Sequence, residues 1–153
     1  RRNRSSSRST PEHTRAESMI RRIRAEGLEP FVVDVRYDTG QDYVLPLVES
    51  GAVTAVMCPT DMRQLQYLRA LSSNGIDVPR QVSVTGCDGF LPGMSVMGLT
   101  TYTWPIGHFA DTVIDTMIDL IKRFRTPDDR REVVSVKFEG EVVAGATVAP
   151  PPL

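Results

Sequence analysis

The sequence contains little cysteine and little histidine, and this scarcity narrows the chemistry that it can support. Of its 153 residues, two are cysteines and two are histidines. Cys58 and Cys87 are too few for a disulfide framework, and each ends an apolar, strand-like run, so we expect buried, reduced thiols. His13 and His108 lie far apart in the sequence, and we predict no metal site. The sequence gives no sign of a cofactor.

Recognisable catalytic motifs are also missing. The sequence has no Gly-x-Ser-x-Gly, no phosphate-binding loop and no Gly-x-Gly-x-x-Gly after an expected strand. Cys58 could in principle act as a nucleophile, but no residue near it in the sequence resembles a general base. We therefore predict a binding module and not an enzyme.

The chain has no strong charge of one sign and no apolar run long enough to span a bilayer. The net charge is -1, from 18 Lys and Arg against 19 Asp and Glu, so no global basic field would attract nucleic acid. Arginines crowd the first 24 residues, and we interpret them as a solvated helix face and a flexible end. No signal peptide is evident, and we expect a cytoplasmic protein that is a fragment of a longer chain.

Hydrophobic periodicity predicts an α/β protein whose parallel sheet is flanked by helices. Helix and strand patterns alternate along the first part of the chain, which is typical of right-handed βαβ units. The expected helices cover residues 11–27, 43–51, 60–75 and 105–125, and the expected strands cover residues 31–35, 53–58, 82–87, 96–103, 133–138 and 142–148.

The stretch from Val82 to Gly89 is the centre of this pattern. Valines at alternate positions suit a strand that is covered on both faces. We expect Gly86 to let the backbone turn, which would place Asp88 at the carboxyl edge of the sheet, where open α/β sheets bind ligands. Asp88 could equally be a loop cap.

Other polar or aromatic residues follow the expected strands and should meet at the same edge. They are Tyr37, Asp61 and Trp104, and Arg15 would reach this edge from the first helix. Carboxylates accept hydrogen bonds from hydroxyl groups, and aromatic rings cover the CH surfaces of sugars, so the set suits a small polyhydroxylated ligand. Alternatively, Asp61 caps a helix, Trp104 lies in the core or an interface, and Arg15 is solvated.

The ordered set of motifs resembles the effector-binding domain of LacI-type transcriptional regulators. It comprises Arg15 after a Ser-rich stretch, residues 54–57 followed by Thr60-Asp61, residues 75–79 leading into 82–88, and residues 99–101. The resemblance implies a periplasmic-binding-protein-like fold of two lobes. Residues 1–11 would be a polar loop, 12–104 the C-terminal lobe, 105–139 elements of the N-terminal lobe, and 140–153 a return strand with a Pro-rich tail.

The resemblance also implies roles for individual residues. The positions of Arg15 and Asp88 grip the effector in the family. The position of Thr60, also implied to bind ligand, is usually asparagine, and the position of Gly89 is often aspartate, so the ligand class is open. The family's dimer face maps onto one helix position and the loop after residue 89, and its apolar members here are Leu65, Phe90, Leu91 and Met94.

These implications define the main hypothesis and its rivals. The chain would bind a small-molecule effector, a sugar or related polyol, between the lobes, form a homodimer, and reach operator DNA only through a helix-turn-helix headpiece that this sequence lacks. It would have no membrane partner. The alternatives are a periplasmic sugar-binding component of a transporter and an enzyme that uses Cys58 or Cys87.

Overall fold

The computed structural model describes residues 10–33, 44–123 and 133–151. The predicted ligand contact Tyr37 lies outside the described residues. The helices are α1 (Thr10–Ala25), α2 (Leu45–Glu49), α3 (Asp61–Ser73), α4 (Met94–Met97) and α5 (Ile106–Arg123), and the strands are β1 (Ala55–Met57), β2 (Ser83–Asp88), β3 (Thr101–Thr103) and β4 (Glu141–Val143).

The strands form one mixed sheet in the order β1-β2-β3-β4. Strand β2 is central and shares its length between two parallel neighbours: Ser83 to Thr85 pair with β1, and Gly86 to Asp88 pair with β3. Strand β4 runs antiparallel to β3. The predicted α/β class is confirmed: β1, β2 and β3 are parallel, and β4 is an antiparallel strand at the edge.

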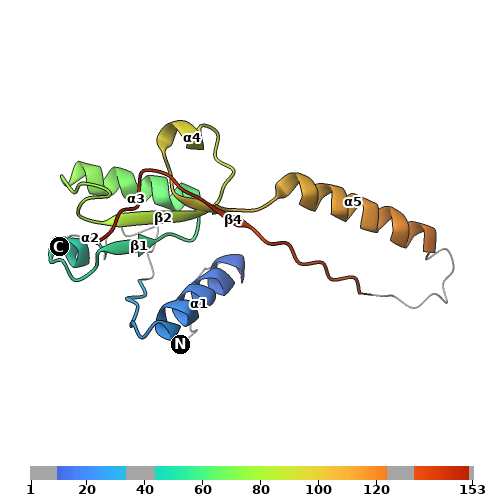
Figure 1. The fold of residues 1–153 in the computed structure, drawn as a ribbon, viewed down its shortest axis with the longest axis horizontal. Coiled ribbons are helices and arrows are strands. Elements are labelled where there is room, and N and C mark those ends of the chain that lie inside the picture. The colour runs from blue at the N-terminus through green and yellow to red at the C-terminus, as the bar shows by residue number, and fades with distance from the viewer. Residues whose placement is uncertain (1–9, 34–43, 124–132, 152–153) are drawn as a thin grey trace, which may run out of the picture.

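Helix α3 covers one face of β2, and α1 lies on the side of the sheet away from it (Figure 1). Helix α3 starts where predicted, because the Thr60 side chain accepts a hydrogen bond from the Arg63 amide at 3.3 Å and caps the first turn. A small core lies beneath it. The core consists of Val48, Cys58, Leu71, Val82 and Val84.

A buried glutamine ties α3 to the rest of the fold. The Gln64 side-chain amide donates to the Val84 carbonyl, the Thr100 carbonyl and the Thr147 hydroxyl at 3.0, 3.1 and 3.2 Å. The Thr147 carbonyl also accepts from the Val84 amide at 2.8 Å. The returning C-terminal segment therefore occupies the part of the β2 edge that β3 leaves free.

Helix α5 and the segment before β4 project away from the sheet together (Figure 1). No residue of α5 is buried. Residues 133–138, predicted to be a strand, have no regular secondary structure, and the same holds for 31–33. A strand needs a neighbouring edge for its hydrogen bonds, and no described strand pairs with these segments. Residues 96–97, predicted to begin an extended stretch, instead belong to α4.

Candidate functional site

The carboxyl ends of the three parallel strands lie at one edge of the sheet, which we call the rim. Pro59 and Thr60 follow β1, Asp88 is the last residue of β2, and Trp104 follows β3. Because β1 and β3 both run parallel to β2, the residues that follow these strands lie at the same edge of the sheet. The rim is therefore the candidate ligand site.

Arg15 of α1 reaches the rim and makes two contacts there. One of its terminal nitrogens lies 2.9 Å from Oδ1 of Asp88, and the other donates to the Pro59 carbonyl at 2.9 Å. The side chains of Arg15 and Asp88 are each 25% exposed, so the pair is partly shielded and still accessible from solvent. The sequence-predicted partners are thus adjacent, and their contact with an effector stays a prediction.

Asp61 lies behind the rim and is 1% exposed. Its Oδ2 accepts a hydrogen bond from the Gly89 amide at 2.6 Å, and its Oδ1 accepts one from the Thr101 hydroxyl. Both carboxylate oxygens therefore already have partners from the ends of neighbouring strands. A direct contact between Asp61 and a ligand stays a prediction.

The chain turns at Asp88 and Gly89, which have φ angles of 128° and 81°. We expected the turn at Gly86, but the strand continues through this residue. Gly86 has a different role: a Cβ at this position would lie 2.5 Å from Oε1 of Gln64 and closer still to Oδ1 of Asp61. The missing side chain lets the start of α3 approach β2 closely.

Trp104 is 37% exposed, and its ring packs edge-on against Tyr102 with 5.4 Å between the centroids. The Tyr102 hydroxyl in turn accepts a hydrogen bond from the Gly140 amide at 2.9 Å. Trp104 thus follows β3 at the rim and keeps a partly open surface.

Thr60, another predicted ligand contact at the rim, uses its side chain to cap α3.

Burial makes both cysteines poor nucleophiles. It raises the pKa of the Cys58 thiol to about 12. Burial also raises the pKa of the Cys87 thiol, with the charge of Arg15 acting in the opposite direction. Since the thiolate is the reactive form, neither side chain is activated at neutral pH. Within the described ranges, no cluster of three or more potential metal ligands occurs.

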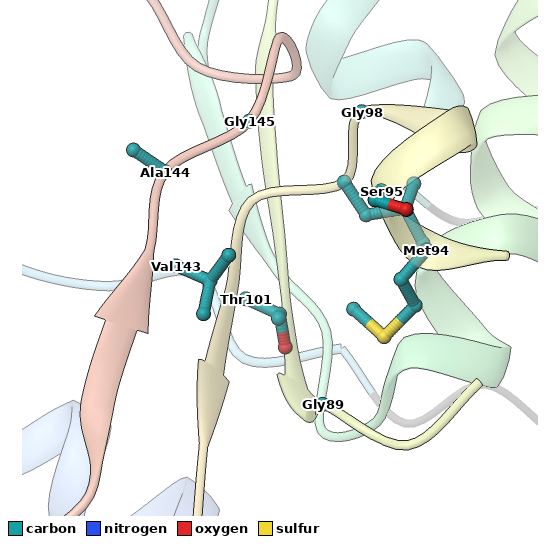
Figure 2. A pocket seen from close by; sticks show the side chains of 9 residues that line it. Gly89, Met94, Ser95, Gly98, Thr101, Val143, Ala144 and Gly145 are labelled. Carbon is teal, nitrogen blue, oxygen red and sulfur yellow. The ribbon is translucent and has the colours of Figure 1, made fainter. Parts of the chain in front are cut away.

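A pocket of about 410 Å³ lies next to this site, between α4 and the strands β3 and β4 (Figure 2). Its walls include Gly89 and Thr101, the two residues that hydrogen-bond to Asp61, but neither Arg15 nor Asp88. The remaining wall residues are apolar or small: Met94, Ser95, Gly98, Leu99, Val143, Ala144 and Gly145. The pocket is therefore a neighbour of the Arg15–Asp88 pair and does not contain it.

The four residues that the resemblance implies for the dimer face are exposed or partly buried. Phe90 is 49% exposed, while Leu65, Leu91 and Met94 are partly buried. Three of the four come from the loop after β2 and from α4, whose Val96 is 90% exposed. The loop and α4 together present an apolar surface.

Sequence reasoning missed the parts played by Gln64 and Thr101. Gln64 falls among the apolar positions of its predicted helix, and a polar residue at such a position signals a buried hydrogen-bonding role. No local pattern distinguishes Thr101 from other strand threonines, because its role depends on a partner 40 residues away.

The sequence matches the family described as the periplasmic binding protein-like domain over residues 3–148. The chain belongs to this family. An HTH-type transcriptional regulator of Mycobacterium tuberculosis is 33% identical over 99 residues, which are 65% of this chain and 25% of the relative. The HTH-type regulator MalR of Streptomyces coelicolor is 36% identical over 100 residues, covering 64% of this chain and 28% of MalR. These matches span about a quarter of each relative.

Solved structures agree with the family assignment. A sugar-binding regulator of the LacI family from Escherichia coli, complexed with phosphate, has a TM-score of 0.73 at 20% identity, over 96% of this chain and 53% of that one. A LacI-family regulator from Arthrobacter, in complex with lactose, has a TM-score of 0.65 at 20% identity, over 87% and 50%. The predicted periplasmic-binding-protein-like fold is confirmed, and these LacI-family regulators share it.

Proposed function

We propose that this periplasmic binding protein-like chain is part of the effector-binding domain of a LacI-type transcription regulator and takes a sugar or related polyol at the rim. The family, the regulators among its relatives and the lactose complex of a structural neighbour support this proposal. The observation that carries it is the contact between Arg15 and Asp88.

The chemistry of the pair suits a polyhydroxylated ligand. The Asp88 carboxylate accepts hydrogen bonds from hydroxyl groups, and the Arg15 guanidinium donates to hydroxyl oxygens, so neighbouring hydroxyls of one sugar can engage both. Charge-assisted hydrogen bonds of this kind are the stronger ones. The partly open ring of Trp104 would cover the apolar CH face, with Thr60 and Tyr37 as further contacts.

Effector binding would regulate transcription by changing the relative orientation of two lobes. A ligand that binds one orientation more tightly shifts the population toward it, by no more than its difference in affinity. In the dimer this shift would reach two headpieces that grip the half-sites of an operator. Contact with DNA would come only from such a headpiece, and a cytoplasmic location follows from that role.

Titration calorimetry of the 153-residue chain against lactose, cellobiose, glucose, ribose and phosphate tests the ligand site. Arg15→Ala and Asp88→Asn should each weaken binding of any hit about 10- to 100-fold, since hydrogen bonds to charged groups contribute about 1.5–3 kcal/mol. Arg24→Ala is the matched control, because Arg24 pairs with Glu29 on the exposed surface. Equal losses in all three variants would contradict the site.

The dimer is a separate part of the proposal. The apolar surface formed by Leu65, Phe90, Leu91 and Met94 would be its contact face, as burial of exposed aromatic and aliphatic groups favours association. Light scattering coupled to gel filtration should show a dimer that Phe90→Asp converts to monomer. Leu28→Asp, at a 65% exposed position outside this surface, should leave it intact. A wild-type chain that is still monomeric at the highest concentration measured would refute this face.

The two rival hypotheses have less support. The relatives are transcription regulators and not enzymes, and the raised pKa of Cys58 argues against thiol catalysis. No helix of the described segments is long and apolar enough to cross a membrane. This finding does not distinguish a regulator from the binding component of a transporter, so the location of the protein has to be measured. Fractionation of native cells would decide between cytoplasm and periplasm.

A further inference from the structure

The buried carboxylate of Asp61 joins three elements behind the rim. Asp61 is the first residue of α3, its Oδ2 accepts from the Gly89 amide just after β2, and its Oδ1 accepts from the Thr101 hydroxyl of β3. A carboxylate that is 1% exposed needs such partners, because an unpaired buried charge is strongly unfavourable.

The same turn is held from the solvent side by Arg15. Its guanidinium contacts both Asp88 and the Pro59 carbonyl. Pro59 lies two residues before Asp61, and Asp88 is bonded to Gly89. The contacts therefore form a closed ring that runs from Pro59 through Arg15, Asp88 and Gly89 to Asp61, and back along the chain.

The backbone at the centre of this ring is strained. Asp88 has a φ of 128°, a value that L-residues adopt rarely and that persists only where the surroundings enforce it. The amide that follows, that of Gly89, is the group that Asp61 holds at 2.6 Å. Asp61 is thus placed to maintain a turn that the chain would not adopt by itself.

We propose that Asp61 is a positioning residue: it fixes the turn at Asp88 and Gly89 so that the Asp88 carboxylate faces Arg15, and it does so without touching the effector. This inference rests on the proposed function for its meaning in ligand binding. The positioning itself can be measured in the absence of any ligand.

The first test is a double-mutant cycle on Arg15→Ala and Asp88→Ala, read by urea unfolding of the full chain. In the wild type the pair should show a coupling of about two- to five-fold in the unfolding constant, as expected for a partly exposed ion pair. The coupling should vanish in Asp61→Ala. It should persist in Thr101→Val, the matched control, which removes one hydrogen bond to Asp61 and leaves the Gly89 contact.

A conservative variant separates geometry from charge. In Asp61→Asn the side-chain oxygen can still accept from the Gly89 amide, and the NH2 group can donate to the Thr101 hydroxyl, so the coupling should be restored. A coupling that survives in Asp61→Ala, or one that is lost equally in Thr101→Val, would overturn the proposal.

A second measurement needs no variant and covers the case in which Asp61→Ala does not fold. In native-state hydrogen exchange, the Gly89 amide should be protected at least about ten-fold more than the amide of Gly93, an exposed residue of the same loop. Equal exchange of the two amides would overturn the inference.

The ligand experiments then become independent of this test. If the coupling depends on Asp61 but no sugar binds, the positioning role holds and the proposed function fails. If a sugar from the panel binds, Asp61→Ala should weaken it about as much as Asp88→Asn does, and Thr101→Val should not. Retained sugar affinity in Asp61→Ala would refute the positioning role while leaving the effector site in place.

Discussion

Replacing Gly86 by alanine tests whether close packing of α3 against β2 forms this site. A Cβ at Gly86 would lie 2.5 Å from Oε1 of Gln64, 3.1 Å from Cα of Asp61 and closer still to Oδ1 of Asp61. Both neighbouring side chains are buried and held by hydrogen bonds, and one of the contacts is to backbone. The start of α3 must therefore move away from the strand.

The expected cost has two parts. Overpacking of a close-packed interior costs about 1–3 kcal/mol. Weakening of the buried hydrogen bonds made by Gln64 and Asp61 adds about 1–2 kcal/mol, since each contributes about 1 kcal/mol net. The free energy of unfolding should thus fall by about 2–5 kcal/mol, and the melting temperature by about 5–15 °C for a chain of this length.

Gly75→Ala is the matched control. Gly75 has a φ of 72°, and nothing lies within 4 Å of a Cβ built there, so alanine adds backbone strain without a clash. That strain costs about 1–2 kcal/mol. Urea denaturation followed by circular dichroism compares the two variants. A Gly86→Ala variant that is no less stable than Gly75→Ala would refute the packing argument.

Two further predictions concern buried groups. Gln64→Leu should lower the free energy of unfolding by about 2–3 kcal/mol, measured by urea denaturation. The reason is that the Val84 and Thr100 carbonyls and the Thr147 hydroxyl each lose a buried hydrogen-bond donor. A decrease below about 0.5 kcal/mol would contradict the proposed link between α3 and the C-terminal segment. For Cys58, the folded-state pKa of about 12 exceeds the ordinary 9.0, so its contribution to stability is complete below pH 9 and should be lost as pH rises toward 12. Cys58→Ala should flatten this part of the stability-against-pH curve, and an unchanged slope would show that other groups cause it.

Local signals in the sequence determined several elements. Thr60 caps α3 as its position before an apolar helix pattern indicates, and that helix ends beside the predicted Asn74-Gly75 signal. The alternating valines from Val82 produce the buried central strand, and the order of strands and helices predicts parallel pairing. Caps, periodicity and connection rules act over a few residues or follow from chain order, so they can be recognised in one sequence.

Only the tertiary structure decided which polar groups meet and which strand patterns become strands. The alternating residues 133–138 lie beside α5 away from the sheet, where no described strand edge is available to them. Asp61 could have faced solvent, a ligand or the interior, and its burial depends on Gly89 and Thr101, which lie 28 and 40 residues away. The positive φ of Asp88 has no local signal, because the contacts that stabilise it come from distant parts of the chain.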